Sequence, residues 1–572
     1  MPFSVETLHR LIIEWIVEGD QSINVVEAPR FRKLLLFLGS DRISDKDIPH
    51  RDKVTSTILK EYHLERLNMI EEMKNTLGRV SLTTDLWSDP NRDSYMGVTA
   101  HYMVRDAKTH RITYRDVLLA FRYVGGSHTG ENLEKEFFKI IEEYGIEKKI
   151  GQVTMDNASN NNTLMEALER ELLKRGIPFH RDGNRVRCFP HIINITVQAI
   201  LEELKRRPTA PYGSSLPLED VFTYVESLQK DPISLVRKVV ATCRASGQRR
   251  RDLQETIKNG NKTGHWATSM IDVGREYTSM PEVQLLRDCE TRWSSTFLMI
   301  DRFLVLFPAI KQYCSLPQNS DAMAHALLSE DDINVLQDIH QLLEIPHAAQ
   351  ELLSAERTPT LSMVFPVFEL LIEQLNKAMK TLPKLSPFIE IAVSKLEEYM
   401  GQCRKTRIYA LATVLNPSMK FDHMKKSGHV GEEARARSWM LEIETERGVD
   451  LVAFWHMYFQ FKETIYPALF RVAMDVLPAQ ASSVACERVF SSSKETCTLR
   501  RSRIGANLLE ALQVLKFRYK QDGLNFTEDL VAHEQDYSIS GRVSERATQE
   551  LLAAGRIDEL EDLILNAETS CE

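Results

Sequence analysis

Three acidic residues lie in local sequences where an acidic side chain needs an explanation. Asp85 lies in the alternating segment RVSLTTDLWSD, Asp156 directly follows the apolar run IGQVTM, and Glu487 has apolar neighbours in SSVACERVFSSS. Each acid also has a structural alternative. Asp85 would cap a strand end, Asp156 would form an Asx turn in DNAS, and Glu487 would face a helix dipole or pair with Arg488.

The segments around the first two acids predict a mixed α/β sheet. Alternating or apolar runs indicate strands at 79–89, 95–104, 112–121 and 150–155, and amphipathic runs indicate helices at 133–144 and 163–175. In the order strand, strand, strand, helix, strand, helix, the first and fourth strands are commonly neighbours. We therefore expect Asp85 and Asp156 to meet at one edge of the sheet.

Two carboxylates that meet in a cleft repel each other unless cations lie between them. Oxygen ligands suit Mg²⁺ or Mn²⁺, and two such ions about 3.5–4 Å apart suit phosphodiester chemistry. One ion would activate a water or a 3′-hydroxyl, and the other would stabilise the leaving oxygen. The placement of the acids therefore favours metal-dependent chemistry on nucleic acid.

The rest of the chain is predicted to be mainly helical. The N-terminal segment has helical spacing but few apolar residues, so we expect it to pack on the following chain or on a partner. Residues 205–265 are polar, with several Pro and Gly, and predict partly flexible loops. The expected domain ranges are 1–78 (helical segment), 79–304 (first part of the core), 305–470 (all-helical insertion), 471–535 (end of the core) and 536–572 (acidic tail).

Composition narrows the class of protein. The 572 residues are 43% apolar and 27% charged, which is ordinary for a globular chain, and the net charge of −9 requires any DNA-binding surface to be local. The eight cysteines form no C-x-x-C pair, which indicates reduced thiols. We expect no signal peptide and no membrane span, because no apolar run reaches about 18 residues.

Several strings resemble, in order, the motifs of the hAT (hobo/Activator-like) DNA transposases, and they span roughly residues 80–520. The strings are TTDLWS (83–88), HTGEN (128–132), MDNASNN (155–161), RCFPHIIN (187–194), TRWSSTF (291–297), ALATVLNPSMKF (410–421) and SSVACERVFSSS (482–493). The resemblance implies a ribonuclease H-like catalytic core that is interrupted by a large all-helical insertion.

The resemblance also assigns roles to individual residues. Asp85, Asp156 and Glu487 correspond to the catalytic, metal-binding triad of the family, with Mg²⁺ or Mn²⁺ as the cofactor. Cys188 and His191 correspond to its C-x-x-H element. We expect no zinc there, because no second ligand pair lies nearby in the sequence, and we favour a packing and positioning role.

DNA-binding roles follow for a second group of residues. Trp293, with Arg292 beside it, corresponds to the tryptophan that stacks on a flipped base during hairpin formation. The alternative is a core tryptophan at a helix start. Arg500, Arg501 and Arg503 would hold a phosphate backbone, or they would merely solvate the helix junction.

The C-terminal segment resembles the dimerisation region of the family, which implies a homodimer or a higher homo-oligomer. Leu508, Leu512, Leu515 and Tyr519 form an apolar stripe at helical spacing, and an intramolecular core role is equally compatible with it. Many members begin with a BED zinc finger, whereas residues 1–78 contain no Cys.

The implied function is transposition, with cleavage at transposon ends, hairpin formation on flanking DNA, and strand transfer to target DNA in the nucleus. The alternative is a domesticated or decayed relative that is catalytically inactive but still associates with DNA and dimerises. The three acids and Trp293 favour the first function, and the missing finger motif with the acidic net charge favours the second.

Overall fold

The computed structural model describes residues 4–89, 91–105, 112–206, 218–268, 279–289, 292–316, 319, 328–353, 360–416, 467–497 and 504–522. The chain forms two compact units. The first, which we call the sheet unit, comprises Met1–Cys188, Glu356–Ser362 and Thr406–Phe526. The second, the helical unit, includes Phe189–Ala355 and Met363–Lys405. The expected tail at 536–572 lies outside the described residues.

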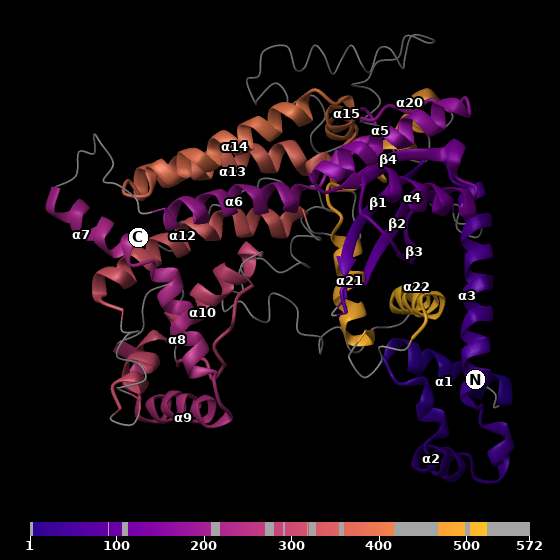
Figure 1. Cartoon of the computed structure of the whole chain (residues 1–572), viewed down its shortest axis with the longest axis horizontal. Coiled ribbons are helices and arrows are strands. Elements are labelled where there is room, and N and C mark those ends of the chain that lie inside the picture. Colours follow the sequence, from indigo (N-terminus) through magenta and orange to yellow (C-terminus); the bar gives the residue numbers. More distant parts are fainter. Residues whose placement is uncertain are drawn as a thin grey trace. The chain divides into compact units, whose positions relative to one another are not determined.

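The sheet unit contains a five-stranded mixed sheet in the order β3-β2-β1-β4-β5 (Figure 1). Its strands are β1 (Val80–Ser88), β2 (Ser94–Arg105), β3 (Ile112–Tyr123), β4 (Ile150–Met155) and β5 (Arg185–Arg187). The first three strands are antiparallel, whereas β4 pairs in parallel with both β1 and β5. The predicted mixed sheet and the pairing of the first and fourth strands are confirmed. The short, charged β5 carries no apolar pattern and was not predicted.

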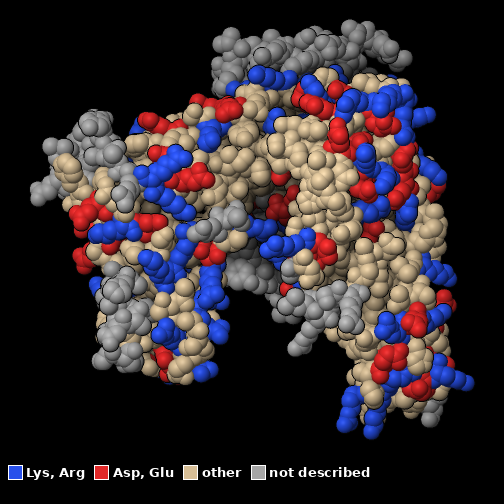
Figure 2. All heavy atoms as spheres, in the orientation of Figure 1, with Lys and Arg blue, Asp and Glu red and all other residues tan. Residues whose placement is uncertain are grey.

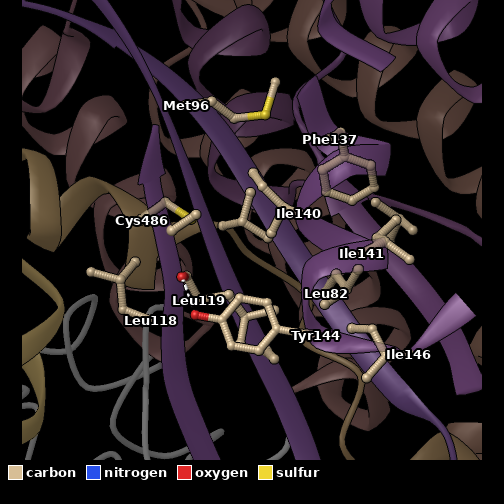
Figure 3. Close-up of a cluster of buried hydrophobic side chains, with 14 of the residues drawn as sticks. Leu82, Met96, Leu118, Leu119, Phe137, Ile140, Ile141, Tyr144, Ile146 and Cys486 are labelled. Atoms are coloured by element: carbon tan, nitrogen blue, oxygen red, sulfur yellow. Dashed lines mark hydrogen bonds between the residues drawn. The ribbon is translucent and has the colours of Figure 1, made fainter. Parts of the chain in front are cut away.

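Helices α4 (Gly130–Tyr144) and α5 (Ser159–Lys174) bury their apolar faces against this sheet. Figure 3 shows Phe137, Ile140 and Ile141 of α4 beside Leu82 of β1. At the end of α4 the Tyr144 hydroxyl donates a hydrogen bond of 2.6 Å to the carbonyl oxygen of Leu119. Burial raises the pKa of Tyr144 well above its ordinary value. The phenol therefore remains a neutral donor.

The C-terminal part of the chain returns to the same sheet. Helix α20 (Pro467–Val476) lies against β2 and β4, and α21 (Val484–Thr496) lies against β1 and β2. The Asp475 carboxylate accepts a hydrogen bond of 2.7 Å from the backbone N–H of Arg79, directly before β1. Residues at opposite ends of the sequence thus complete one unit.

The N-terminal helices pack on the last helix. They are α1 (Val5–Glu18), α2 (Pro29–Gly39) and α3 (Arg51–Lys74), and the last described helix is α22 (Ala506–Asp522). Ile12 and Ile16 of α1 and Ile58 of α3 form one buried cluster with Leu512 and Leu515 of α22. Leu508 and Tyr519 border this cluster. The apolar stripe of the C-terminal segment is therefore covered within the chain.

The helical unit is larger than the sequence predicts. It contains α6 (Phe189–Lys205), α7 (Leu218–Gln229), α8 (Pro232–Cys243), α9 (Gly247–Thr263), α10 (Trp293–Cys314), α12 (Glu330–Leu353), α13 (Val364–Thr381) and α14 (Ser386–Arg404) (Figure 1). It begins at Phe189, well before the expected boundary at 305.

The prediction of loops for residues 205–265 is wrong for the described part of that range, which holds most of three helices. Pro232 does not break a helix here, because it occupies the first turn of α8, where its missing N–H costs nothing. Asp231 caps this helix by accepting a hydrogen bond of 3.0 Å from the Ser234 N–H. Val236 and Val240 then bury one face.

Helix α10 is long and apolar enough, by composition alone, to cross a membrane. However, 78% of its most apolar window is buried inside the protein, which is the pattern of a central core helix.

On the visible face of the sheet unit, Figure 2 shows Lys and Arg interspersed with Asp and Glu, so no single sign of charge dominates there.

We predict that Leu515→Ala lowers the free energy of unfolding of the sheet unit by about 2–5 kcal/mol, because a buried leucine leaves a cavity where α22 meets the N-terminal helices. Chemical denaturation measures this loss. Leu34→Ala removes an exposed leucine of α2 and should change the stability by less than about 0.5 kcal/mol. Unchanged stability with impaired dimerisation in Leu515→Ala would contradict the intramolecular role of the stripe.

Candidate active site at the ends of β1 and β4

The parallel pairing of β1 with β4 brings Asp85 and Asp156 to one place. Thr83 of β1 pairs with Thr154 of β4. Asp85 and Asp156 each follow two residues later in the same direction, so they lie level with each other. Asp85 and Asp156 are both half-buried and are among the residues that line one small pocket of about 50 Å³. The expected meeting of the two aspartates at one edge of the sheet therefore agrees with the observed register.

Asp156 also has the structural role that the alternative gave it. Its Oδ1 accepts hydrogen bonds from the Ala158 N–H at 2.9 Å and from Nδ2 of Asn161 at 2.5 Å. The first bond closes an Asx turn that leads into α5. A carboxylate has about four acceptor positions, so this turn leaves capacity for a further ligand.

Two arginines on β5 support the turn. Arg185 donates a hydrogen bond of 3.0 Å to the backbone oxygen of Asp156, and Arg187 donates one of 2.9 Å to Oδ1 of Asn157. Burial, together with the neighbouring Arg187 charge, lowers the pKa of Arg185 to about 10, so it remains a cation at neutral pH. Sequence reasoning assigned no role to either residue, although Arg187 begins the RCFPHIIN string and Arg185 lies two residues before it.

Glu487 comes from α21, which packs on the face of β1 that contains Asp85. Alternation along a strand places Thr83, Asp85 and Trp87 on one face. The hydroxyl of Thr83 lies 3.3 Å from Sγ of Cys486, so the helix meets β1 directly before the aspartate.

Beyond the aspartate, the Trp87 ring stacks on Phe490 with centroids 6.2 Å apart. Asp85 is therefore bracketed by two contacts with α21. Glu487 is half-buried and lies between Cys486 and Phe490 in the sequence of that helix.

A glycine permits this close approach of α21. Gly97 of β2 pairs with Asp85. A Cβ atom at Gly97 would lie 2.9 Å from Cε1 of Phe490 and 3.5 Å from Cβ of Cys486. The first separation is too short for two carbons, so the helix that carries Glu487 depends on the missing side chain.

The start of α21 has no side-chain cap. Ser483 is the N-cap residue of this helix, but its side chain makes no capping hydrogen bond. Its hydroxyl lies 3.4 Å from Sγ of the buried Cys188 instead. Cys188 also donates its backbone N–H to the Met155 carbonyl oxygen at 3.0 Å, next to Asp156. These contacts are those of a packing residue.

The donor set of the site suits a hard divalent cation, because carboxylates and asparagine oxygens are the ligands that Mg²⁺ and Mn²⁺ prefer. Within the ranges that the structure describes, no three His, Cys, Asp or Glu side chains are grouped closely enough to hold one ion. Coordination by Asp85, Asp156 and Glu487 together would therefore require their side chains, or α21, to move closer.

The remaining predicted residues lie elsewhere. Trp293 begins α10 in the helical unit, is only 2% exposed, and packs edge-on against His347 with ring centroids 6.3 Å apart. This arrangement agrees with the alternative that Trp293 is a core tryptophan at a helix start. Stacking on a flipped base would require the ring to leave the core. Arg292 is exposed directly before it, and the half-buried His191 belongs to α6.

Arg500, Arg501 and Arg503 lie outside the described residues. Their predicted contact with a phosphate backbone therefore stays a prediction. The part of α21 that precedes them ends at Thr496, and α22 follows at Ala506.

A mixed sheet in this strand order, with one acid in β1, a second directly after β4, and a large helical unit inserted before the helix that carries the third, defines a ribonuclease H-like α/β protein. Family models agree with this class along the chain. Residues 83–183 match the ZBED1 RNase-like domain, residues 186–342 the ZBED1 RNase-like helical domain, and residues 436–519 the hAT family C-terminal dimerisation region. The chain belongs to the hAT family of transposases and transposase-derived proteins.

Some relatives of the chain are named as transposases, and others are named as regulators or zinc finger proteins. The chain is 23% identical to the "Putative transcriptional regulator tpeD" of Talaromyces stipitatus, across 95% of this chain and 66% of that protein. It is 23% identical to the "Putative AC transposase" of Zea mays, across 89% of this chain and 64% of that protein. It is 21% identical to "Zinc finger BED domain-containing protein 4" of Homo sapiens, across 72% of this chain and 30% of that protein. The chain thus spans about two thirds or less of the length of these relatives.

We predict that Gly130→Ala displaces the DNASNN turn. A Cβ atom at Gly130, which begins α4 in the HTGEN string, would lie 2.7 Å from the backbone nitrogen of Leu164 and would also meet the carbonyl oxygen of Asn160. Because backbone cannot yield like a side-chain end, we expect a stability loss of about 1–3 kcal/mol. Hydrogen exchange of residues 157–162 should become faster.

Gly401→Ala is the matched control, since it makes the same change in α14 where a Cβ atom has open space. There the substitution should be neutral or stabilising, by up to about 1 kcal/mol. Equal stability of the two variants, with unchanged exchange at the turn, would contradict the close packing of α4 on α5.

Proposed function

We propose that this chain carries the catalytic core of a DNA transposase, in which Asp85, Asp156 and Glu487 support metal-dependent cleavage and strand transfer. One observation carries the proposal. The parallel register of β1 and β4 places two carboxylates in one pocket, on the sheet that α21 covers with the third acid. Two aspartates in one half-buried pocket are costly unless a cation is bound between them.

The chain's own residues would hold and orient the reacting phosphodiester. Asp85 and Asp156 would hold Mg²⁺ or Mn²⁺, which supplies Lewis acidity and an activated water or 3′-hydroxyl. Glu487 would complete the carboxylate set when its side chain turns toward the pocket. Arg185 and Arg187 would keep the Asp156 turn rigid while they partly offset its charge. Hairpin formation on flanking DNA would use Trp293 after release of its ring.

The DNA partners would be transposon ends and target DNA, in the nucleus. The match of residues 436–519 to a dimerisation region supports a homodimer or a higher homo-oligomer. Since the stripe on α22 is buried against α1 and α3, the interface would use other surfaces of that region.

A second function is favoured by two observations. The relative that covers 95% of this chain is named a transcriptional regulator, and the Asx turn of Asp156 gives this acid a purely structural role. On this alternative, the chain is a transposase-derived protein that associates with DNA and dimerises but does not cleave it.

Paired variants of Asp156 separate the two functions. Asn at this position keeps the Oδ1 acceptor of the Asx turn but lacks the charge, whereas Ala lacks both. We predict that the free energy of unfolding of Asp156→Asn stays within about 0.5 kcal/mol of the wild-type value, and that this free energy falls by about 1 kcal/mol in Asp156→Ala. Both variants should lose at least about 100-fold in cleavage rate. The assay is Mg²⁺- or Mn²⁺-dependent nicking and strand transfer on DNA that carries the element's own ends.

Asp89→Asn is the matched control. Oδ1 of Asp89 accepts hydrogen bonds of 2.8 Å from the N–H groups of Asn91 and Asp93, so it closes a similar turn directly after β1. It should retain activity. Metal-dependent product from Asp156→Asn would refute the catalytic assignment. DNA binding by folded wild type, with no product in either metal, would establish the non-catalytic alternative.

A further inference from the structure

A line of hydrogen-bonded polar side chains crosses the sheet on the face that α21 covers. The hydroxyls of Thr83 and Thr99 lie 2.5 Å apart, and the Thr99 hydroxyl lies 2.8 Å from Nε2 of His101. Nδ1 of His101 lies 2.7 Å from the hydroxyl of Tyr114, which accepts a hydrogen bond of 2.6 Å from Nε2 of Gln480. We call these five residues the polar chain.

Both ends of the polar chain reach the segment that contains Glu487. At one end, the Thr83 hydroxyl lies 3.3 Å from Sγ of Cys486, the residue before Glu487. At the other end, Gln480 lies in the turn that precedes α21. Its backbone oxygen accepts a hydrogen bond of 2.7 Å from the hydroxyl of Thr154 on β4. The polar chain thus connects three strands with the start of α21.

The Gln480 amide is held at both of its ends. Its Oε1 accepts a hydrogen bond of 3.1 Å from the Thr360 hydroxyl, which itself accepts one of 2.9 Å from the Ala481 N–H. Its Nε2 faces the Tyr114 hydroxyl.

From Gln480 onward each side chain lies within hydrogen-bond distance of the next. The two ring nitrogens of His101 bridge the Tyr114 and Thr99 hydroxyls, and the Thr99 hydroxyl lies beside that of Thr83. Each hydroxyl in this line can both donate and accept.

His101 is fully buried, and burial lowers its pKa to about 3. The imidazole is therefore neutral at neutral pH, so the polar chain carries no charge there.

We propose that the polar chain sets the register of α21 on the sheet, so that His101 and Tyr114 act as positioning residues for Glu487. The contact of Phe490 with Trp87 is apolar and non-directional, and by itself it would tolerate a sliding or rotated helix. Hydrogen bonds are directional, and a displaced α21 would break the bond between Gln480 and Tyr114 and the contact of Thr83 with Cys486. The observed seating of the helix satisfies both.

The proposal has a structural part, which stands alone, and a catalytic part, which rests on the proposed function. The structural part is tested through the reactivity of Cys486. This residue is buried, and burial raises the pKa of its thiol to about 12. Alkylation of this thiol requires α21 to leave the sheet. Peptide mass spectrometry of full-length protein treated with N-ethylmaleimide gives the rate at each cysteine.

We predict that Tyr114→Phe increases the alkylation rate of Cys486 about ten-fold, which is the factor that one lost buried hydrogen bond represents. Tyr144→Phe is the matched control, because it removes one buried phenol hydroxyl from the packing of α4 on the sheet. It should leave Cys486 protected. The exposed Cys289 checks the reagent, and the buried Cys403 of the helical unit checks global unfolding.

A second pair of variants tests the hydrogen bond itself. Thr99→Val is nearly isosteric but has no hydroxyl, whereas Thr99→Ser retains it. Cys486 should become reactive in the valine variant and remain protected in the serine variant. Wild-type protection of Cys486 in both Tyr114→Phe and Thr99→Val would overturn the proposal.

The catalytic part is tested with the same proteins. Tyr114→Phe should lower the cleavage rate at saturating DNA with an unchanged KM, because it misplaces Glu487 and leaves the DNA-binding surface intact. Tyr144→Phe should not change this rate. If wild type does not cleave DNA, the proposed function fails, while the alkylation rates still decide whether the polar chain positions α21.

Discussion

The parallel pairing of β1 with β4 is the constraint on which the candidate site depends. Parallel neighbours run in the same direction, so the register that pairs Thr83 with Thr154 places the residue after β4 level with Asp85 of β1. The connection between them has to cross over the sheet, and α4 provides that crossover. The close approach of Gly130 to the start of α5 then fixes the turn that contains Asp156. One topological choice thus determines where two acids meet.

The C-terminal part of the chain covers the sheet that the N-terminal part forms. The sheet has one face covered by α4 and α5, and the other is covered by helices that come from beyond residue 466. The returning segment is fixed by directional bonds, among them the bond from Thr154 to Gln480 and the bond from Arg79 to Asp475. The N-terminal helices have no separate core and depend on α22 for burial. The core of the sheet unit is therefore complete only with α22 in place.

Membership of the hAT family and the local geometry bear on function in different ways. The family match explains why a helical unit interrupts the sheet unit, and why the last acid lies so far along the chain. The geometry explains how each acid is held: Asp156 by an Asx turn and two arginines, and Glu487 by a helix seated on Gly97. Both agree with the proposed catalysis, but the same turn would also persist in a relative that does not cleave DNA.

The sequence by itself determined the strands, the order that makes the first and fourth strands neighbours, and the acids at their ends, because strand periodicity and strand-end positions are local. It could not determine β5, the helices within 205–265 or the burial of Trp293, since short charged strands, N-terminal prolines and helix-start tryptophans have no local signal for their environment. Only the tertiary structure decided that the stripe on α22 is internal and that His101, Tyr114 and Gln480 form one line. Such contacts join residues hundreds of positions apart, and side-chain hydrogen bonds across that separation leave no periodic pattern.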